Sequence, residues 1–566
     1  MGRYLIEPFD SSDRYATERY QGAAGRNWWR CDPSLHLLMR RHLGDGYAWA
    51  EPHLDRLGAL MGGLIAECAE ETDRNPPRLE KYDKWGRDVS QVVMPPSFHA
   101  ARQALMADNF TSPAFAEQAR ANGADPAALS AAWTYLLDQA DIGMGCALGT
   151  GGDMVVSLAE RHAPDDVKER VRDIFADGFY SGEAAQMFTE RTGGSDLAAL
   201  EATAVPDGDS WRLSGFKWFA SNANGSAFVV LARHGGHEGS VAPFLVLWER
   251  RDGTRNGVRI RRLKDKLGTR SVASAEVEFA DAEAFLLAGQ GSGSGLGTMM
   301  KLTNGSRLGV AMMGLGVARR ALVESLCYAR AREAFGRPLA EQPLMRRKLA
   351  ELIVEVEAVQ ALVFDGHLGP RLRLAPALVK LRAARLGVTA ASDAVEAHGG
   401  NGYIEQWPVA RLLRDAQVNP IWEGGDNILC LDVRRAMLRE NAHEPFIDRL
   451  AAAADQAPPG DATVDLVRGR IDDLRKAITV WASLPPAVAE ARLFPLAQFM
   501  ADVYAAALLL EQAGWEERNG HGDRKALVAR LYADAHLADQ GPLRGIDRPG
   551  DELEHFDDLL AGALAP

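Results

Sequence analysis

The sequence predicts an α+β protein with four successive parts: a helical N-terminal domain, a middle antiparallel β domain, a C-terminal four-helix bundle and an extra helical region. Three observations support this prediction. The chain of 566 residues is about four times a typical domain length, so several domains are expected. Its 47% hydrophobic and 25% charged residues are typical of a globular protein. Apolar residues recur at helical spacing before residue 186 and after 297, with short alternating runs between them.

Residues 1–185 are expected to form an N-terminal extension and an all-α domain. Helix-like apolar spacing runs through 53–70 and 97–140. The segment 75–88 contains two adjacent prolines and a Trp-Gly pair, which interrupt a helix, so a loop is predicted there. Glycines at 143–152 resemble a dinucleotide-binding loop, but no strand precedes them and the segment is not interpreted as one.

The middle domain is expected at 186–288, where β-branched and aromatic residues form short runs such as AFVVLAR at 227–233. The Gly/Ser-rich segment 289–297 lacks the GK[ST] ending of a phosphate-binding loop and is interpreted as a linker. Long amphipathic helices then predict a bundle over 298–440, followed by an additional Ala/Leu-rich helical region at 443–566.

Charge and cysteine content narrow the function classes. The net charge of −13 disfavours a polyanionic partner such as nucleic acid and favours small-molecule chemistry. The five cysteines are far apart and lack zinc-site spacing, so no metal site is predicted and reduced thiols are expected. The chain starts without a signal-peptide pattern, and charges interrupt its apolar stretches, so a cytoplasmic protein without membrane contact is expected.

Four segments contain residue types suited to ligand binding. The segment MFTERTGGSD at 187–196 exposes backbone N–H groups and hydroxyls in a turn that either binds a polar ring edge or phosphate, or is an ordinary turn. GFKWFASN at 215–222 pairs an aromatic residue with a hydroxyl two positions later. The third segment, 331–352, contains an RxxFG turn. The fourth, 393–437, contains two double glycines and Glu423, which is either a carboxylate with an apolar wall or a simple helix-start residue.

Together, these four segments, in this order, resemble the acyl-CoA dehydrogenase superfamily of flavoproteins. The motifs are TExxGGSD, GxK-aromatic, RxxFG, and GGNGY followed by an EG loop, and they cover about 186–437. The segment NPPRLEKYDKWGR and the additional C-terminal helices resemble the longer AidB-type branch, the adaptive-response alkylation proteins. The resemblance implies the family fold, an FAD cofactor, an acyl-CoA thioester substrate, a homotetramer built as a dimer of dimers, and an electron-transferring flavoprotein as partner.

The resemblance also implies a set of site residues, several of which contact the FAD of a neighbouring subunit. At the position of the family's glutamine this chain has Glu396, and His398 is either a flavin contact or a packing residue. The implied cofactor-binding residues are Phe188, Thr189, Gly194, Ser195, Phe219, Ser221, Arg332, Phe335, Glu396, His398, Gly399, Gly400, Gly425 and Asn427. The implied substrate-binding residues are Asn304, Arg307 and Trp422, with Arg307 either a pocket cation or a helix-face charge.

The family's reaction removes a proton from the α-carbon of the thioester while a hydride leaves the β-carbon for flavin N5. A carboxylate in a dry pocket suits the first task, since desolvation raises its basicity. Some branches place the base before an arginine on a helix, but this position is Ser306 here, which favours Glu423 as the catalytic residue.

Two alternative functions are compatible with the resemblance and are disfavoured by other features of the sequence. The first is an AidB-like protective flavoprotein associated with the DNA alkylation response, with weak or vestigial dehydrogenase activity. In that branch the C-terminal region binds DNA, whereas residues 441–566 contain 21 acidic and 12 basic residues here, a net charge of −9. The second is an oxidase of the same fold, which typically uses an aspartate base.

Overall fold

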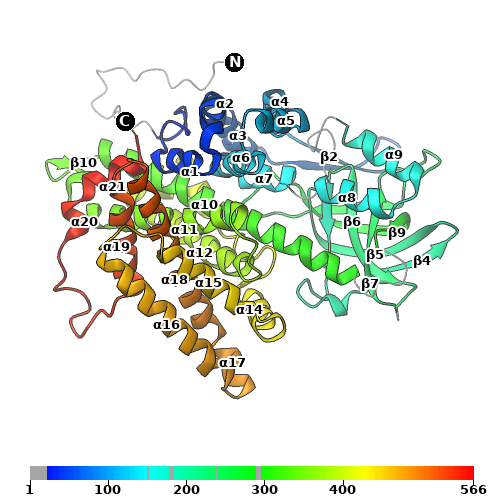
Figure 1. Cartoon of the computed structure of the whole chain (residues 1–566). Helices are drawn as coiled ribbons and strands as arrows, with labels where there is room; N and C mark the ends of the chain where they lie inside the picture. The colour runs from blue at the N-terminus through cyan, green and yellow to red at the C-terminus, as the bar shows by residue number, and fades with distance from the viewer. Residues whose placement is uncertain (1–21, 150–151, 177–183, 238, 289–294, 566) are drawn as a thin grey trace, which may run out of the picture.

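The computed structural model describes residues 22–149, 152–176, 184–237, 239–288 and 295–565. The N-terminal part is helical, as predicted (Figure 1). Most of the predicted 289–297 linker lies outside the described residues. The N-terminal helices are α1 (Pro33–Leu43), α2 (Tyr47–Leu60), α3 (Ala66–Arg74), α4 (Pro96–Asp108), α5 (Pro113–Ala121), α6 (Pro126–Ala140), α7 (Ile142–Gly149), α8 (Gly152–His162) and α9 (Asp165–Ile174), with the short helices η1 (Gly44–Gly46) and η2 (Met61–Ile65) between α1 and α3.

The prediction of a loop at 75–88 is wrong, because this segment forms most of a β-hairpin. Strands β1 (Arg78–Tyr82) and β2 (Asp88–Val93) pair antiparallel around a turn that the Asp83 carboxylate stabilises by accepting from two backbone N–H groups. The hairpin attaches to the β domain through side chains: Lys81 Nζ donates to the carbonyl of Ile260 at 2.7 Å. The two prolines precede the strands rather than interrupt a helix, so the hairpin could form there.

The middle part is a seven-stranded sheet, which confirms the predicted β domain. Its strands are β3 (Ala184–Met187), β4 (Thr203–Asp207), β5 (Ser210–Ser221), β6 (Ala227–His234), β7 (Val241–Leu247), β8 (Val258–Leu263) and β9 (Ser274–Leu286). Most neighbours pair antiparallel, but β3 and β4 both run parallel to β6. Parallel pairing needs a connection longer than a hairpin. Here the chain passes through other strands before returning as β6.

The bundle that follows the sheet is built around α10 (Gly295–Ala331) and α12 (Ala375–His398), which pack along each other (Figure 1). Its other helices are α11 (Pro343–Leu368), α13 (Pro408–Ala416) and α14 (Asp426–Glu440), with the small hairpin β10 (Glu333–Ala334) and β11 (Arg337–Pro338) and the 3₁₀ turns η4 (Leu339–Glu341) and η5 (Gly399–Tyr403). These helices share one hydrophobic core with α1–α7, whereas α8 and α9 pack on strands of the sheet, which also has a core of its own. The bundle and α1–α7 therefore form a common scaffold beside the sheet.

The predicted additional helical region packs on the bundle away from the sheet. Its helices α16 and α17 project from the rest of the molecule, at the bottom of Figure 1. Its helices are α15 (His443–Ala454), α16 (Ala462–Ala482), α17 (Pro486–Ala491), α18 (Leu493–Arg518), α19 (Arg524–His536), α20 (Asp551–Glu554) and α21 (Phe556–Ala563). Buried ion pairs join it to the bundle: the Glu357 carboxylate on α11 accepts from Arg524 and from Lys525, the latter at 2.5 Å.

Two helical stretches, Ile142–His162 and Leu493–Arg518, are long and apolar enough to cross a bilayer by length and composition alone. In both, most of the most apolar 18-residue window is buried inside the protein, as in the core helices of a folded domain. They are therefore weak evidence for a membrane span.

Candidate active site

Glu423 lies in the short loop between α13 and α14, in a backbone conformation that is unusual for a glutamate. Its φ is 55°, and that of the following Gly424 is 101°. A left-handed φ at a residue with a side chain costs about 1–3 kcal/mol, so surrounding contacts must hold it. Gly425 then caps α14, and Asp426 begins it. The loop therefore turns sharply between two helices and depends on its neighbours for its shape.

Two cations from separate helices hold this loop. Arg307 on α10 donates from Nε to the carbonyl oxygen of Glu423 at 3.3 Å. Lys380 on α12 donates from Nζ to the carbonyl oxygen of Gly424 at 2.6 Å. The carbonyls of two successive residues are thus bound from two sides.

The electrostatic setting of Glu423 suits a proton acceptor. Burial raises the pKa of its carboxyl above the ordinary value, and the charges of Arg307 and Lys380 oppose that rise. The Cys146 thiol on α7 lies near enough that the Glu423 charge helps burial raise the pKa of this thiol to about 12. A carboxylate with a raised pKa is a better base than one in water.

Arg307 itself is buried, with 2% of its surface exposed. Its Nη1 forms a 2.6 Å ion pair with Asp432 on α14, and it also donates to Asn304 Oδ1 at 3.1 Å. Arg373 binds the same Asp432 carboxylate at 2.7 Å. Arg307 is therefore not an exposed helix-face charge, and its charge is already balanced by Asp432. The substrate-binding roles of Arg307, Asn304 and the half-buried Trp422 remain predictions.

A buried ion pair next to Thr189 stabilises the β-domain turn that contains this residue. Lys217 Nζ lies 2.5 Å from Glu190 Oε1, and both side chains are at most 3% exposed. Burial lowers the pKa of Lys217 to about 8, while Glu190 opposes the shift. A Cβ on Gly194 would lie 2.7 Å from the Thr189 hydroxyl, so glycine allows the turn to close over this residue. Gly194 and Ser195 are exposed, and Phe188 and Thr189 are half-buried.

On β5, Phe219 presents 54% of its surface to solvent, and Ser221 is half-buried. Ser221 Oγ lies 3.3 Å from Ser274 Oγ, which accepts from Nζ of the half-buried Lys266 at 3.2 Å. Burial lowers the pKa of Lys266 to about 8, and the nearby Cys146 is the first of the groups that oppose this shift. Hydrogen bonds thus connect Ser221 through Ser274 to Lys266, and the charges of Lys266 and Glu423 act in opposite directions on the pKa of Cys146.

The RxxFG and GGNGY segments do not join this group within one chain. Phe335, at the tip of the β10–β11 hairpin, is 97% exposed, and Arg332 is exposed as well. The hairpin lies at the end of the molecule opposite the sheet (Figure 1). Gly399 and Gly400 are exposed nearby on η5. These residues are therefore exposed on the surface of the single chain.

Glu396 and His398 differ in their surroundings. The Glu396 carboxylate is exposed and pairs with Lys348 at 2.7 Å. His398 is 2% exposed, and its ring stacks on that of Tyr328 with 4.2 Å between the centroids. Its Nδ1 lies 2.7 Å from the carbonyl of Ala394. His398 thus packs inside the bundle, while its part in cofactor binding remains a prediction, as do those of the half-buried Gly425 and the exposed Asn427.

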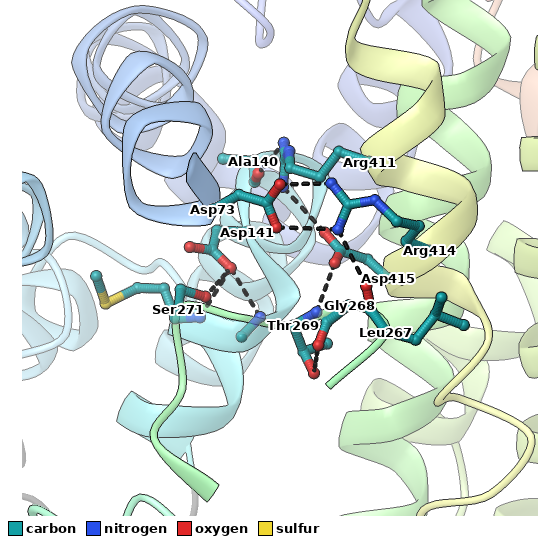
Figure 2. A network of polar contacts seen from close by, with 12 residues as sticks. Asp73, Ala140, Asp141, Leu267, Gly268, Thr269, Ser271, Arg411, Arg414 and Asp415 are labelled. Carbon is teal, nitrogen blue, oxygen red and sulfur yellow. Dashed lines mark hydrogen bonds and ion pairs between the residues drawn. The ribbon is translucent and has the colours of Figure 1, made fainter. Parts of the chain in front are cut away.

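A polar network fixes the helix that leads into the Glu423 loop (Figure 2). Arg411 on α13 bonds Asp415 at 3.0 Å and the carbonyl of Ala140 at 2.9 Å. Arg414 pairs with Asp73 on α3 and donates to the carbonyl of Leu267. The network ties α13 to the N-terminal helices and to the loop between β8 and β9. Helix α13, which precedes the Glu423 loop, is thus bonded to the end of α6, to α3 and to the β8–β9 loop.

Sequence reasoning missed Lys380, Asp432, Lys266 and Cys146 as neighbours of the site. Lys380 could have been noticed, because it lies among apolar residues on one face of a predicted helix, with Ala377 and Ala384 at helical spacing. A charged residue there needs a partner. The other three offered no comparable signal, since each approaches the site from a different part of the chain.

Family models match three successive stretches of the chain. Residues 20–176 match the adaptive response protein AidB N-terminal domain, 185–282 the acyl-CoA dehydrogenase middle domain, and 293–438 the acyl-CoA dehydrogenase C-terminal domain. The chain is 33% identical to AidB of Escherichia coli over 76% of its own length and 82% of the relative's.

Two solved structures illustrate the fold. ACDH-11 of Caenorhabditis elegans, in complex with C11-CoA, superimposes with a TM-score of 0.84 at 24% identity and covers 95% of this chain and 96% of its own. An acyl-CoA dehydrogenase of Bacillus anthracis, complexed with FAD, gives a TM-score of 0.65 at 18% identity and covers 89% of this chain and 95% of its own. At these identities the likeness establishes the fold, including the helical, β and helical order of the parts.

Proposed function

The chain belongs to the acyl-CoA dehydrogenase family, in its AidB-type branch, and we propose that Glu423 is the base of its oxidoreductase reaction. The substrate is an acyl-CoA thioester. The Glu423 carboxylate takes the proton from the α-carbon as the α,β double bond forms. The observation that supports this proposal is a half-buried glutamate whose pKa is raised by burial of its carboxyl, in a strained loop held by Arg307 and Lys380.

The residues present suit the FAD that members of this family use. Phe219 is more than half exposed on the same strand as Ser221, and Gly194 and Ser195 are exposed in their turn, where a cofactor could reach the backbone. Thr189 and Ser221 would donate to the polar edge of the flavin, and Phe188, Gly194 and Ser195 would line it. When bound, FAD accepts the hydride that leaves the β-carbon. The backbone N–H of Glu423 would stabilise the developing negative charge on the thioester oxygen.

The cofactor site is proposed to be shared between subunits of a homotetramer. The exposure of Arg332, Phe335, Gly399 and Gly400 supports this, as does the position of the β10–β11 hairpin at the end of the molecule opposite the sheet (Figure 1). Arg332→Ala is therefore expected to weaken both FAD retention and assembly, measured by flavin absorbance and sedimentation. A monomer with full flavin occupancy would contradict the shared site.

The reaction is tested by anaerobic incubation with saturated acyl-CoAs of different chain lengths, including an eleven-carbon chain, because the relative in complex with C11-CoA shares the fold. Bleaching of the flavin absorbance by at least one of them is expected. An electron-transferring flavoprotein is proposed to accept the electrons from the reduced enzyme. The protein is proposed to be cytoplasmic. A flavin that none of the acyl-CoAs reduces would contradict the dehydrogenase function.

The second candidate is a protective, DNA-associated flavoprotein, which the AidB-type N-terminal match favours. The charge of the C-terminal region argues against tight binding, and Arg434, in a basic cluster on α14, is already paired with Glu490 at 2.8 Å. Weak and strongly salt-dependent duplex binding is expected. Tight binding that survives moderate salt would favour this candidate instead.

A further inference from the structure

Lys380 is a fully buried lysine beneath the Glu423 loop. The residue is 0% exposed, and its Nζ donates to the Gly424 carbonyl at 2.6 Å. A buried ammonium is unfavourable unless nearby groups compensate it, and a single carbonyl is a weak counterpart for a full charge. The position of Lys380 therefore requires an opposite charge.

The charged groups that face Lys380 are Glu423 and Asp426, which attract it, and Arg307 and Arg385, which repel it. Three of these already have close partners: Arg385 and Asp426 bind each other at 2.6 Å, and Arg307 binds Asp432 at the same distance. Among these groups, Lys380 and Glu423 are the opposite charges that remain to balance each other.

The backbone around Glu423 is set by the same contact. Arg307 binds the carbonyl of Glu423 from α10, and Lys380 binds that of Gly424 from α12. Each peptide unit is planar, so the orientation of two successive carbonyls is set by the φ and ψ torsions of the residue between them, here Gly424. The two cations therefore restrain the left-handed conformation of Gly424, directly after Glu423, and hold the loop from which the Glu423 side chain projects.

We propose that Lys380 is a positioning residue for the base: its ammonium holds the Gly424 carbonyl, and its charge favours the carboxylate form of Glu423. The proposal rests on the function proposed above, in which Glu423 takes the proton. It assigns Lys380 no contact with substrate. Its effect reaches the reaction only through Glu423.

The electrostatics of both groups agree with this role. Burial lowers the pKa of Lys380 to about 8, and Asp426 and Glu423 oppose that shift, so the ammonium is mostly charged at neutral pH. Burial raises the pKa of Glu423, and Lys380 is one of two cations that limit the rise. Removing the charge of Lys380 would therefore raise the pKa of Glu423 further.

The test uses FAD-loaded, full-length protein in three variants. Lys380→Met removes the charge and the hydrogen bond, and Lys380→Arg keeps a cation. Lys525→Met is the matched control, because Lys525 is equally buried but pairs with Glu357, remote from the loop. The first measurement is hydrogen exchange of the peptide 418–428. Faster exchange is expected in Lys380→Met only, with protection restored by Lys380→Arg.

The second measurement is the rate of flavin bleaching at saturating acyl-CoA, as a function of pH. In Lys380→Met the maximal rate should fall about tenfold to a hundredfold, as expected for a displaced catalytic group, with little change in acyl-CoA affinity. Its acidic limb should move to higher pH, because the base then ionises at higher pH. Lys380→Arg should recover part of the rate, and Lys525→Met should shift neither quantity.

The outcomes separate this proposal from the one on which it rests. Exchange that is equal in Lys380→Met and wild type overturns the positioning role, whatever the kinetics. If wild type bleaches and Lys380→Met bleaches with the same rate and pH profile, the role is overturned while the proposed function stands. If wild type does not bleach at all, the proposed function fails, and the exchange result still decides whether Lys380 holds the loop.

Discussion

Two glutamates, the buried Glu357 and the half-buried Glu423, show how the same residue type serves two purposes in this protein. Glu357 on α11 directly contacts Arg524 and Lys525, and their charges lower the pKa of its carboxyl to about 2. Glu423 faces Arg307 and Lys380, but both cations donate to backbone carbonyls, and burial raises the pKa of its carboxyl. Where cations bind the carboxylate itself, the glutamate joins two parts of the molecule. Where they bind the backbone around it, its oxygens remain available for a proton.

The largest expected effect comes from Glu423→Gln, which keeps the shape and removes the proton acceptor. Flavin bleaching by acyl-CoA should fall by about 10²–10⁴-fold, the usual contribution of a general base, while FAD and acyl-CoA still bind. Stopped-flow absorbance measures it. Bleaching at the wild-type rate would place the base elsewhere, with Glu396 and Asp426 as the other acidic candidates in the GGNGY–EG region.

Glu357→Gln should act on stability instead of chemistry. It leaves Arg524 and Lys525 buried without their anion, and breaking a buried pair in this way costs about 3–5 kcal/mol. Urea denaturation measures the loss, and the bleaching rate of the remaining folded protein should equal that of wild type. Arg434→Ala, which removes an exposed ion pair to Glu490, is the control and should cost about 1 kcal/mol or less.

The pH dependence of stability should distinguish the two residues in the acid range. The pKa of Glu357 is lower in the folded than in the unfolded protein, so its contribution is complete above the ordinary value of 4.5. The contribution should be lost as the pH falls from there toward 2. The stability difference between wild type and Glu357→Gln should therefore shrink over this range. A difference that is constant with pH would show that the Glu357 charge is not responsible.

The smallest effect is expected for the stability of Glu423→Gln. This variant should gain stability, whereas Glu357→Gln should lose it. A carboxyl with a raised pKa binds its proton more tightly in the folded state, so ionisation as the pH rises costs stability. Glu423→Gln should thus be more stable than wild type at neutral pH, and the gain should vanish at low pH, as measured by urea denaturation at both pH values. A neutral-pH loss would indicate that the cations stabilise Glu423 as they do Glu357.

Much of the fold follows from local pattern. Helical periodicity predicted the N-terminal helices and the bundle, and alternating runs predicted the β domain between them. The hairpin at 78–93 was missed because its stability comes from side chains such as Lys81 bonding to β8, about 180 residues away in the chain. The parallel pairing of β3 with β6 was missed for the same reason: strand direction depends on connections that no local window contains.

The sequence by itself determined where the chemistry is expected, because Glu423, the GGSD turn and the GGNGY segment are recognisable as short motifs with fixed residue types. Only the tertiary structure decided how Glu423 is held and charged. Arg307, Lys380, Asp432 and Cys146 come from four helices, and their influence depends on separations of a few ångströms that folding creates. Coulomb energy and desolvation depend on distance and burial in space, so a one-dimensional pattern names the glutamate but cannot set its pKa.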